Sequence, residues 1–201
     1  MSMCLKGGRV IDPASNLDKI ANVYIDNGSV VAIGRAPRNF KPDEIENVRG
    51  LIVCPGLIEL SAHLREPGFE HKGSIVSECR AAAAGGFTTV CCTPDTQPVI
   101  DNASVVEHIK QRAAQTRAAR VQCLGALTRG LDGQALAEMR ALKESGCVAV
   151  TNADNAIADT SVLRQALAYA ASCELTVILR PRDYWLSSEG KMHEGAVSTR
   201  L

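Results

Sequence analysis

From Pro55 onward, short apolar runs alternate with helical stretches, and this alternation restricts the fold more than any other feature of the sequence. The runs are GLIEL, FTTVCC, RVQCLG, CVAVT and LTVIL, at intervals of about thirty residues. Strands that are apolar along their whole length are typical of a parallel sheet that is buried on both faces. The pattern therefore predicts five successive βα units.

Capping residues mark the ends of the helices between these runs. The stretches SIVSECRAAAAGG and GQALAEMRALKESG end on glycine, whereas NASVVEHIKQRAAQ opens on Asn102 and DTSVLRQALAYAAS opens on Asp159. Asparagine and aspartate side chains accept hydrogen bonds from the first free amides of a helix, and glycine takes up the backbone conformation that follows its last turn. We therefore expect a helix in each of the four stretches.

The first part of the chain has a different pattern. CLKGGRVID, ANVYIDNGSVVAIG and GLIVCP are short β-branched runs separated by turn residues, and Asp26-Asn27-Gly28 provides the positive φ angles of a tight hairpin. The sequence thus predicts a small β domain over residues 1–54, followed by an α/β domain over residues 55–201.

Two parallel architectures fit the second domain: an open doubly wound sheet and a (β/α)8 barrel. The polar clusters HLREPG, TPDTQP, TNADN and RPRDYW follow four of the five runs, where both folds place their sites. No glycine-rich phosphate loop follows the first run, which disfavours a nucleotide-binding sheet. Five units are too few to close a barrel of around 250 residues.

Composition excludes several classes of partner. The chain has 22 basic and 22 acidic residues and no long run of like charge, so neither nucleic acid nor an anionic membrane is an expected partner. No apolar run approaches the roughly 18–20 residues that span a bilayer, and the N-terminus lacks the apolar block of a secretory signal, which predicts a cytoplasmic protein. The eight cysteines contain no Cys-x-x-Cys pair and are expected to be buried thiols.

Four longer segments carry a family resemblance. LKGGRVIDP, PGLIELSAHLREPGFEHK, AAAAGGFTTVCCTPDTQPVID and MHEGAVSTRL occur in this order along nearly the whole chain. Together they resemble dihydroorotases of the amidohydrolase superfamily. The resemblance implies a metal-containing (β/α)8 TIM barrel, of which about the first five βα units are present, with a small N-terminal β-sandwich domain. It also implies hydrolysis or formation of a cyclic amide in de novo pyrimidine biosynthesis.

The positions that the resemblance assigns to metal binding are largely changed. Where the family has His-x-His-x-Arg after the first barrel strand, this chain has Ser61 and His63; Asn152 stands in place of a ligand aspartate, and Arg180 in place of a ligand histidine. A serine hydroxyl is a poor zinc ligand, an amide carries no charge to offset the ion, and arginine does not deprotonate. The resemblance thus implies a vestigial site that retains only His63 of the family ligands in this chain, without a cofactor.

Of the two positions that the resemblance assigns to substrate binding, one matches the family and the other differs. Arg65 matches the residue that holds the substrate carboxylate in the family, whereas Asp95 replaces an asparagine that donates to the same group. A carboxylate at position 95 would repel the carboxylate of the substrate. Alternatively, Arg65 and Glu66 would pair with each other, or with Arg180 and Asp154, in a salt-bridge network that fills the vacated pocket.

The resulting interpretation is an inactive dihydroorotase-like protein. The resemblance implies a partner, the catalytic chain of aspartate transcarbamoylase, because inactive dihydroorotase-like chains assemble with that enzyme as non-catalytic subunits in some bacteria. The alternative is an active, zinc-dependent hydrolase that converts dihydroorotate to N-carbamoyl-L-aspartate. Its site would be rebuilt from His63, Asp95, Asp154 and residues of strands six to eight, which should supply the last ligand and the catalytic aspartate.

A second alternative is a metal-free protein that binds a small anion through Arg65, Arg180 and Arg182. A replacement metal ligand from His193 is a weaker hypothesis, because this histidine lies in a glycine-flanked loop well beyond the fifth run.

Overall fold

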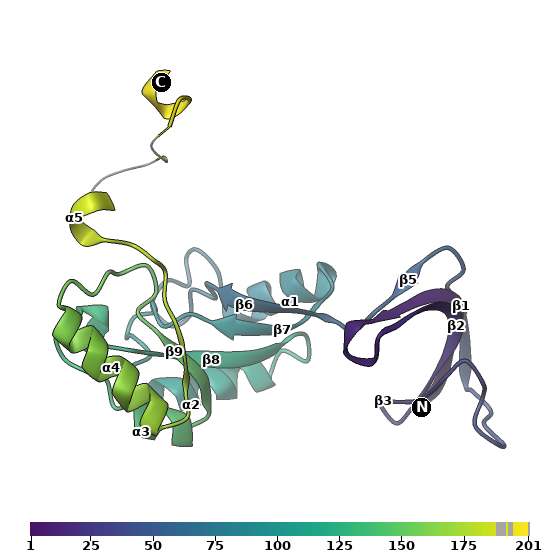
Figure 1. The fold of residues 1–201 in the computed structure, drawn as a ribbon. Helices are drawn as coiled ribbons and strands as arrows, with labels where there is room; N and C mark the ends of the chain where they lie inside the picture. Colours follow the sequence, from purple (N-terminus) through teal and green to yellow (C-terminus); the bar gives the residue numbers. More distant parts are fainter. Residues whose placement is uncertain (188–191, 193–194, 201) are drawn as a thin grey trace. The chain divides into compact units, whose positions relative to one another are not determined.

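The computed structural model describes residues 1–187, 192 and 195–200. The chain forms two compact units, Met1–Gly56 and Leu57–Leu201. Figure 1 shows a β-rich first unit and a second unit in which strands alternate with helices.

The first unit contains one five-stranded sheet. Its order is β3-β2-β1-β4, and β5 also pairs with β1. The strands are β1 (Ser2–Asp12), β2 (Leu17–Asp26), β3 (Ser29–Ile33), β4 (Glu44–Asn47) and β5 (Ile52–Val53), with a short helix η1 (Pro13–Ser15) after β1. Asn27 and Gly28 have φ angles of 48° and 77° in the predicted hairpin between β2 and β3. The β-rich N-terminal region is thus confirmed, although the second layer of a sandwich is not among the described strands.

The second unit contains a parallel sheet whose strands follow the order of the chain. They are β6 (Leu57–Ala62), β7 (Phe87–Cys92), β8 (Arg120–Ala126), β9 (Cys147–Thr151) and β10 (Thr176–Ile178). Each strand pairs in parallel with the next. A doubly wound sheet would reverse its strand order at a switch point, whereas a barrel does not. The uninterrupted order β6 to β10 therefore favours the first part of a barrel.

Helices connect these strands and cover one face of the sheet (Figure 1). They are α1 (Ile75–Ala84), α2 (Ala103–Ala114), α3 (Met139–Glu144) and α4 (Thr160–Ser172), with the short helix η2 (Arg129–Leu131) after β8. Helices α5 (Tyr184–Ser187) and η3 (Ser198–Arg200) follow β10. Asn102 caps α2 and Asp159 caps α4, as predicted. Ser74 and Ser77 form a reciprocal capping box at α1.

The main core lies between the sheet and the helices. Val90, Cys92 and Cys123 of the strands pack there with side chains such as Ile75 of α1 and Ile109 of α2. A second cluster of buried side chains joins β9 to α4. A third, small cluster consists of one residue from each of β7, β8 and β9, namely Cys91, Leu124 and Ala149. Seven of the eight cysteines are buried, and all eight are free thiols.

The helix predicted over residues 133–146 is shorter than expected. The segment before α3 pairs with the chain that follows β8 instead: Thr128 forms an isolated bridge with Leu136, and Ala137 donates to the Leu127 carbonyl at 3.1 Å. Gly133 has a φ angle of 75° and donates to Thr128 Oγ1. These hydrogen bonds hold residues 133–137 in a non-helical form that helix propensity alone does not predict.

Within the described residues, no helix has both the length and the apolar character needed to cross a membrane.

Candidate functional site

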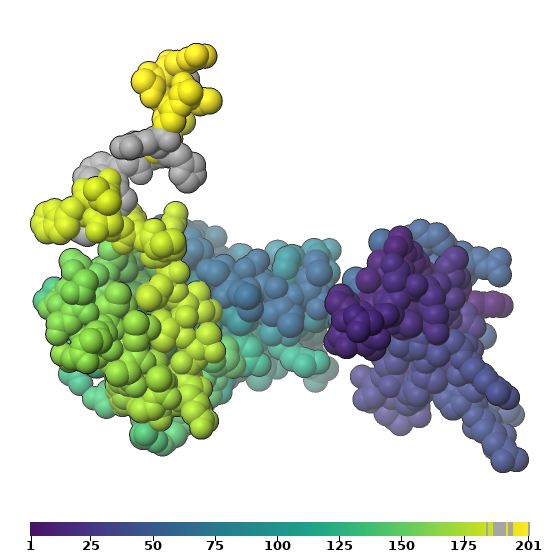
Figure 2. Space-filling view, viewed as in Figure 1, coloured from purple at the N-terminus to yellow at the C-terminus, as the bar shows by residue number. Residues whose placement is uncertain are grey.

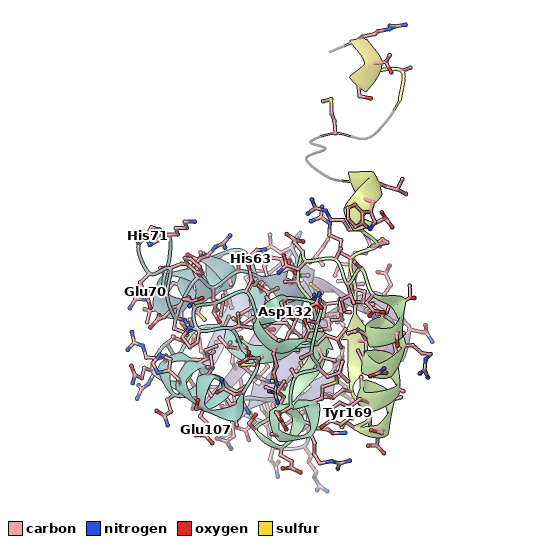
Figure 3. All side chains as sticks on the ribbon, turned by 90° about the vertical axis from the view of Figure 1, so that its left-hand side faces the viewer. His63, Glu70, His71, Glu107, Asp132 and Tyr169 are labelled. Atoms are coloured by element: carbon pink, nitrogen blue, oxygen red, sulfur yellow. The ribbon has the colours of Figure 1, made fainter. Side chains whose placement is uncertain are left out.

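Most of the candidate residues lie at the carboxyl ends of the parallel strands. His63 follows β6, Asp95 follows β7, Asn152 follows β9 and Arg180 follows β10. Because the carboxyl ends of parallel strands meet at one edge, these residues share one end of the second unit. Figure 3 shows His63 at the same end as Glu70 and His71. Ser61 lies within β6, where it is exposed and its amide donates to the Glu59 carboxylate.

The His63 imidazole is held through one nitrogen. Nδ1 lies 2.9 Å from Asp95 Oδ2 and 3.1 Å from Thr93 Oγ1. The Thr93 hydroxyl donates to the Ala62 carbonyl, so its oxygen accepts from the imidazole, as does the carboxylate. The network therefore assigns a proton to Nδ1 and, in the neutral ring, leaves Nε2 as an acceptor.

His63 lies in the loop after β6, and Asp95 lies in the loop after β7. The backbones of these two loops pack against each other. Gln97 N donates to the Pro67 carbonyl at 2.9 Å, and a Cβ atom at Gly68 would lie 2.3 Å from the Gln97 carbonyl oxygen. Gly68 also has a φ angle of 97°, which favours glycine. Arg65, in the first loop, has a φ angle of 65°, an uncommon conformation for a residue with a side chain. The contact between the loops brings Arg65 and Asp95 together.

The expected pairing of Arg65 with Glu66 is wrong. Glu66 is buried, and its Oε1 accepts from Arg112 Nε of α2 at 2.8 Å, while its Oε2 accepts from the amide of Ile75 at 2.8 Å. The carboxylate thereby caps the first turn of α1 and ties the loop to α2. Arg65 instead lies near Asp95, with 3.9 Å between Nη1 and Oδ2.

Asn152 is buried, with an exposed fraction of 1%. Its Oδ1 accepts from Thr128 Oγ1 at 2.7 Å, and its Nδ2 donates to the carbonyls of Asn155 at 3.1 Å and Leu131 at 3.5 Å. Both ends of the amide therefore have partners inside the protein. The side chain joins the loop after β9 to the turn after β8.

Arg180 forms the predicted ion pair with Asp154, at 2.7 Å between Nη1 and Oδ1. Both side chains are exposed, so the pair does not fill a closed pocket as expected. Arg182 is also exposed and has an interaction within the protein. His193 lies outside the described residues.

Sequence reasoning missed three contributors to the site. Thr93 and Thr128 each follow a predicted strand closely, and this position is the only signal for them. Arg112 gives no such signal, because its partner Glu66 is 46 residues away. The spacing of residues along the sequence does not predict an ion pair between a helix residue and a partner so far away in the chain.

Two of the side chains at the family's ligand positions, Asn152 and Arg180, do not fit a zinc centre. Zinc takes deprotonated sulfur, imidazole nitrogen or carboxylate oxygen, whereas the Asn152 amide is occupied by internal hydrogen bonds and Arg180 is a cation. Among the residues that the structure describes, no group of three or more histidines, cysteines, aspartates or glutamates is arranged to hold a metal ion.

Comparison with solved structures supports the fold. An L-hydantoinase (dihydropyrimidinase) from Arthrobacter aurescens has a TM-score of 0.75 at 19% identity, over 89% of this chain and 40% of that chain. A D-hydantoinase has a TM-score of 0.71 at 20% identity, over 90% of this chain and 40% of that chain. These likenesses confirm a partial α/β TIM barrel with a small β-rich N-terminal region.

Comparison of sequences gives the family. Residues 50–201 match the family model described as Dihydro-orotase-like. Over 201 residues, all of this chain, it is 47% identical to a dihydroorotase-like protein of Pseudomonas aeruginosa and 43% identical to a dihydroorotase of Geobacter sulfurreducens, and it covers 48% and 47% of those proteins. The chain thus spans about half the length of the curated relatives it matches. Because the family model covers most of the chain, the protein belongs to the dihydro-orotase-like family.

Proposed function

We propose that this chain is the barrel-forming part of a non-catalytic dihydroorotase-like protein, which serves as a structural subunit of aspartate transcarbamoylase in the cytoplasm. The proposal has two parts, the loss of metal-dependent hydrolysis and the retention of a partner. The environment of one residue, Asn152, carries the first part.

Asn152 stands where the family resemblance places a ligand aspartate, and its amide is directed into the protein. The oxygen accepts from Thr128 and the nitrogen donates to two backbone carbonyls. A metal at this position would have to displace the Thr128 hydroxyl from a buried acceptor and would gain no negative charge in return. The amide is therefore part of the scaffold rather than an available ligand.

Charge supports the same conclusion at the other positions. Arg180 places a guanidinium where the resemblance implies a ligand, and Asp95 places a carboxylate where it implies an amide that binds the substrate carboxylate. A fixed cation disfavours a metal ion, and a fixed anion disfavours an anionic substrate. The two changes oppose both components of dihydroorotate hydrolysis.

The partner rests on the family resemblance and on the state of the scaffold. Helix caps, strand pairing and the core are in place in the second unit, so a folded scaffold is available for a partner. The loop after β6 is ordered by Glu66 and has exposed side chains at its tip, including Glu70, His71 and Lys72. This loop is a surface that a partner would contact.

Metal analysis and a dihydroorotate hydrolysis assay test the first part. We expect no stoichiometric zinc and no turnover, both for the unchanged protein and for Ser61→His, because that variant leaves Asn152 and Arg180 in place. Close to one zinc per chain that is lost in His63→Ala, or turnover by Ser61→His, would contradict the proposal.

Co-purification with the aspartate transcarbamoylase of the same organism tests the second part. We expect a stoichiometric complex that is unchanged by a chelator, since the proposal assigns no metal to this end of the sheet. Separate elution at micromolar concentration, where about 8 kcal/mol of binding free energy would be detected, would refute the partnership.

A further inference from the structure

Two arginines without a partner lie at the amino-terminal end of the parallel sheet. Arg117 lies in the turn between α2 and β8, and Arg120 is the first residue of β8. Both are exposed, and within the described residues neither side chain forms an ion pair or a hydrogen bond. Because parallel strands all begin at one end of the sheet, these guanidinium groups lie at the end opposite to His63.

The two arginines line one cavity. Its volume is about 300 Å³, and Lys110 of α2 and several alanines of α2 and the turn complete the lining, which contains no aspartate or glutamate among the described residues. A second cavity of about 280 Å³ shares Arg120 with the first, and is also lined by Ala83 of α1 and Phe87 of β7. We call the two adjoining cavities the basic groove.

The local backbone holds the basic groove in place. Thr116 Oγ1 donates to the Ala113 carbonyl at 2.9 Å and accepts from the Ala118 amide at 3.3 Å, which fixes the turn after α2. Lys110 Nζ donates at 2.5 Å to the carbonyl that follows α3. Arg117 has a φ angle of 48°, an uncommon conformation for a residue with a side chain. The cationic side chains are therefore anchored at the groove without an internal anion.

We propose that the basic groove binds an extended acidic segment of a partner protein. Each guanidinium presents a planar set of donors that matches a carboxylate. The alanine-rich floor and the cavity beside Phe87 accommodate a small apolar side chain between the acidic ones. The chain has equal numbers of basic and acidic residues, so the attraction for an acidic segment is a property of this groove and not of the whole surface.

The presence of two cavities favours a peptide over a small anion. A single carboxylate or phosphate would use the first cavity and leave the second one empty. An extended segment places neighbouring side chains in both, and Arg120 lies where the cavities meet. The proposal goes beyond the proposed function, because it depends neither on the loss of catalysis nor on the identity of the partner.

The test measures binding of a fluorescein-labelled peptide, Glu-Glu-Leu-Glu-Glu, to the 201-residue chain by fluorescence anisotropy. We expect saturable binding that weakens when the NaCl concentration rises from about 50 mM to about 300 mM, because exposed charges are screened by salt. The matched peptide Lys-Lys-Leu-Lys-Lys should not bind. Glu-Glu-Ser-Glu-Glu should bind about fivefold more weakly, because it lacks the apolar side chain.

Substitutions locate the site. We expect Arg117→Asn/Arg120→Gln to bind the acidic peptide about tenfold more weakly, the factor that corresponds to two exposed ion pairs. Asparagine is used at position 117 because it tolerates a positive φ angle. Arg164→Gln on α4 is the matched control, since Arg164 is also exposed and has no ion pair among the described residues. Ala83→Leu fills the second cavity and should remove the preference for leucine over serine in the peptide.

No saturable binding, equal binding of the lysine peptide, or the same loss in Arg164→Gln as in the double variant would overturn the proposal. Displacement of the labelled peptide by free glutamate as effectively as by unlabelled peptide would also overturn it, because the site would then take a small anion. Circular dichroism verifies that each variant is folded. If the double variant is not, Arg120→Gln alone takes its place, with an expected loss of about threefold. Peptide binding has no catalytic readout and needs no transcarbamoylase, so this proposal and the proposed function can fail separately.

Discussion

At the scale of single residues, the Asn152 side chain holds together the loops at one end of the sheet. The Asn152 amide uses both a donor and an acceptor in a buried network, which a carboxylate cannot reproduce because it only accepts. Restoring a family-like ligand at this position would therefore conflict with the present structure. The hydrogen bonds of Asn152 tie the loop between β9 and α4 to the turn after β8.

We predict that Asn152→Asp destabilises the protein by about 2 kcal/mol, because a buried carboxylate would face the carbonyls of Leu131 and Asn155 without a donor. Urea unfolding measures the change. Asn39→Asp is the control, since Asn39 is exposed, lies outside this network, and its substitution should cost less than about 0.5 kcal/mol. Equal stability of the two variants would show that the network around Asn152 contributes little.

The buried thiols lead to a prediction about pH. Burial raises the pKa of Cys123 to about 11 and that of Cys147 to about 12. Above the ordinary thiol pKa of about 8.5 the unfolded chain releases protons that the folded chain retains, so the free energy of unfolding falls as pH rises through this range. Thermal unfolding between pH 8 and pH 10 should show this fall, and Cys123→Ala should make it shallower. An identical slope for the variant would contradict the assignment.

At the scale of elements, one ion pair between a loop and a helix holds a site loop in place. Glu66 connects the loop after β6 to the first turn of α1 and to Arg112 on α2. This arrangement fixes the loop that carries Arg65.

We expect Glu66→Ala to destabilise the second unit by about 2 kcal/mol, because it removes a charge-assisted bond to the Ile75 amide and leaves Arg112 without its carboxylate. The estimate is moderate because Arg112 is partly exposed. Glu70→Ala in the same loop removes only an exposed contact with Gly68 N and should cost less than about 0.5 kcal/mol. The denaturant midpoints of the two variants measure the difference in stability. Equal midpoints would show that Glu66 does not stabilise the second unit more than Glu70 does.

These elements also show what could be predicted from sequence. Asn102 and Asp159 mark helix starts correctly because capping is local chemistry. The length of α3 and the partner of Glu66 were predicted wrongly because both depend on contacts distant in sequence. The position of Asn152 followed from a motif, whereas its buried hydrogen bonds required three segments of the folded chain.

At the scale of the whole molecule, the described parallel sheet ends in two edge strands, each with one side that pairs with no other strand of the sheet. β6 and β10 each have one neighbour in the sheet. Ile58 and Leu60 of β6 have exposed fractions of 60% and 61%. In Figure 2 the yellow-green segment that contains β10 lies at the surface beside α4. Unpaired strand edges with apolar side chains are prone to associate.

We therefore predict that the 201-residue chain self-associates when it is isolated. Size-exclusion chromatography with light scattering should show a mass above 21.4 kDa at roughly 10 µM, where an interface of about 7 kcal/mol would be populated. Leu60→Glu should reduce the apparent mass, because it places a charge on the apolar surface of β6. Leu167→Glu on α4 is the control: Leu167 is also exposed, at 43%, but lies on a helix whose backbone amides are already paired. A monomer at all concentrations, or an equal effect of the two substitutions, would show that β6 is not the associating surface.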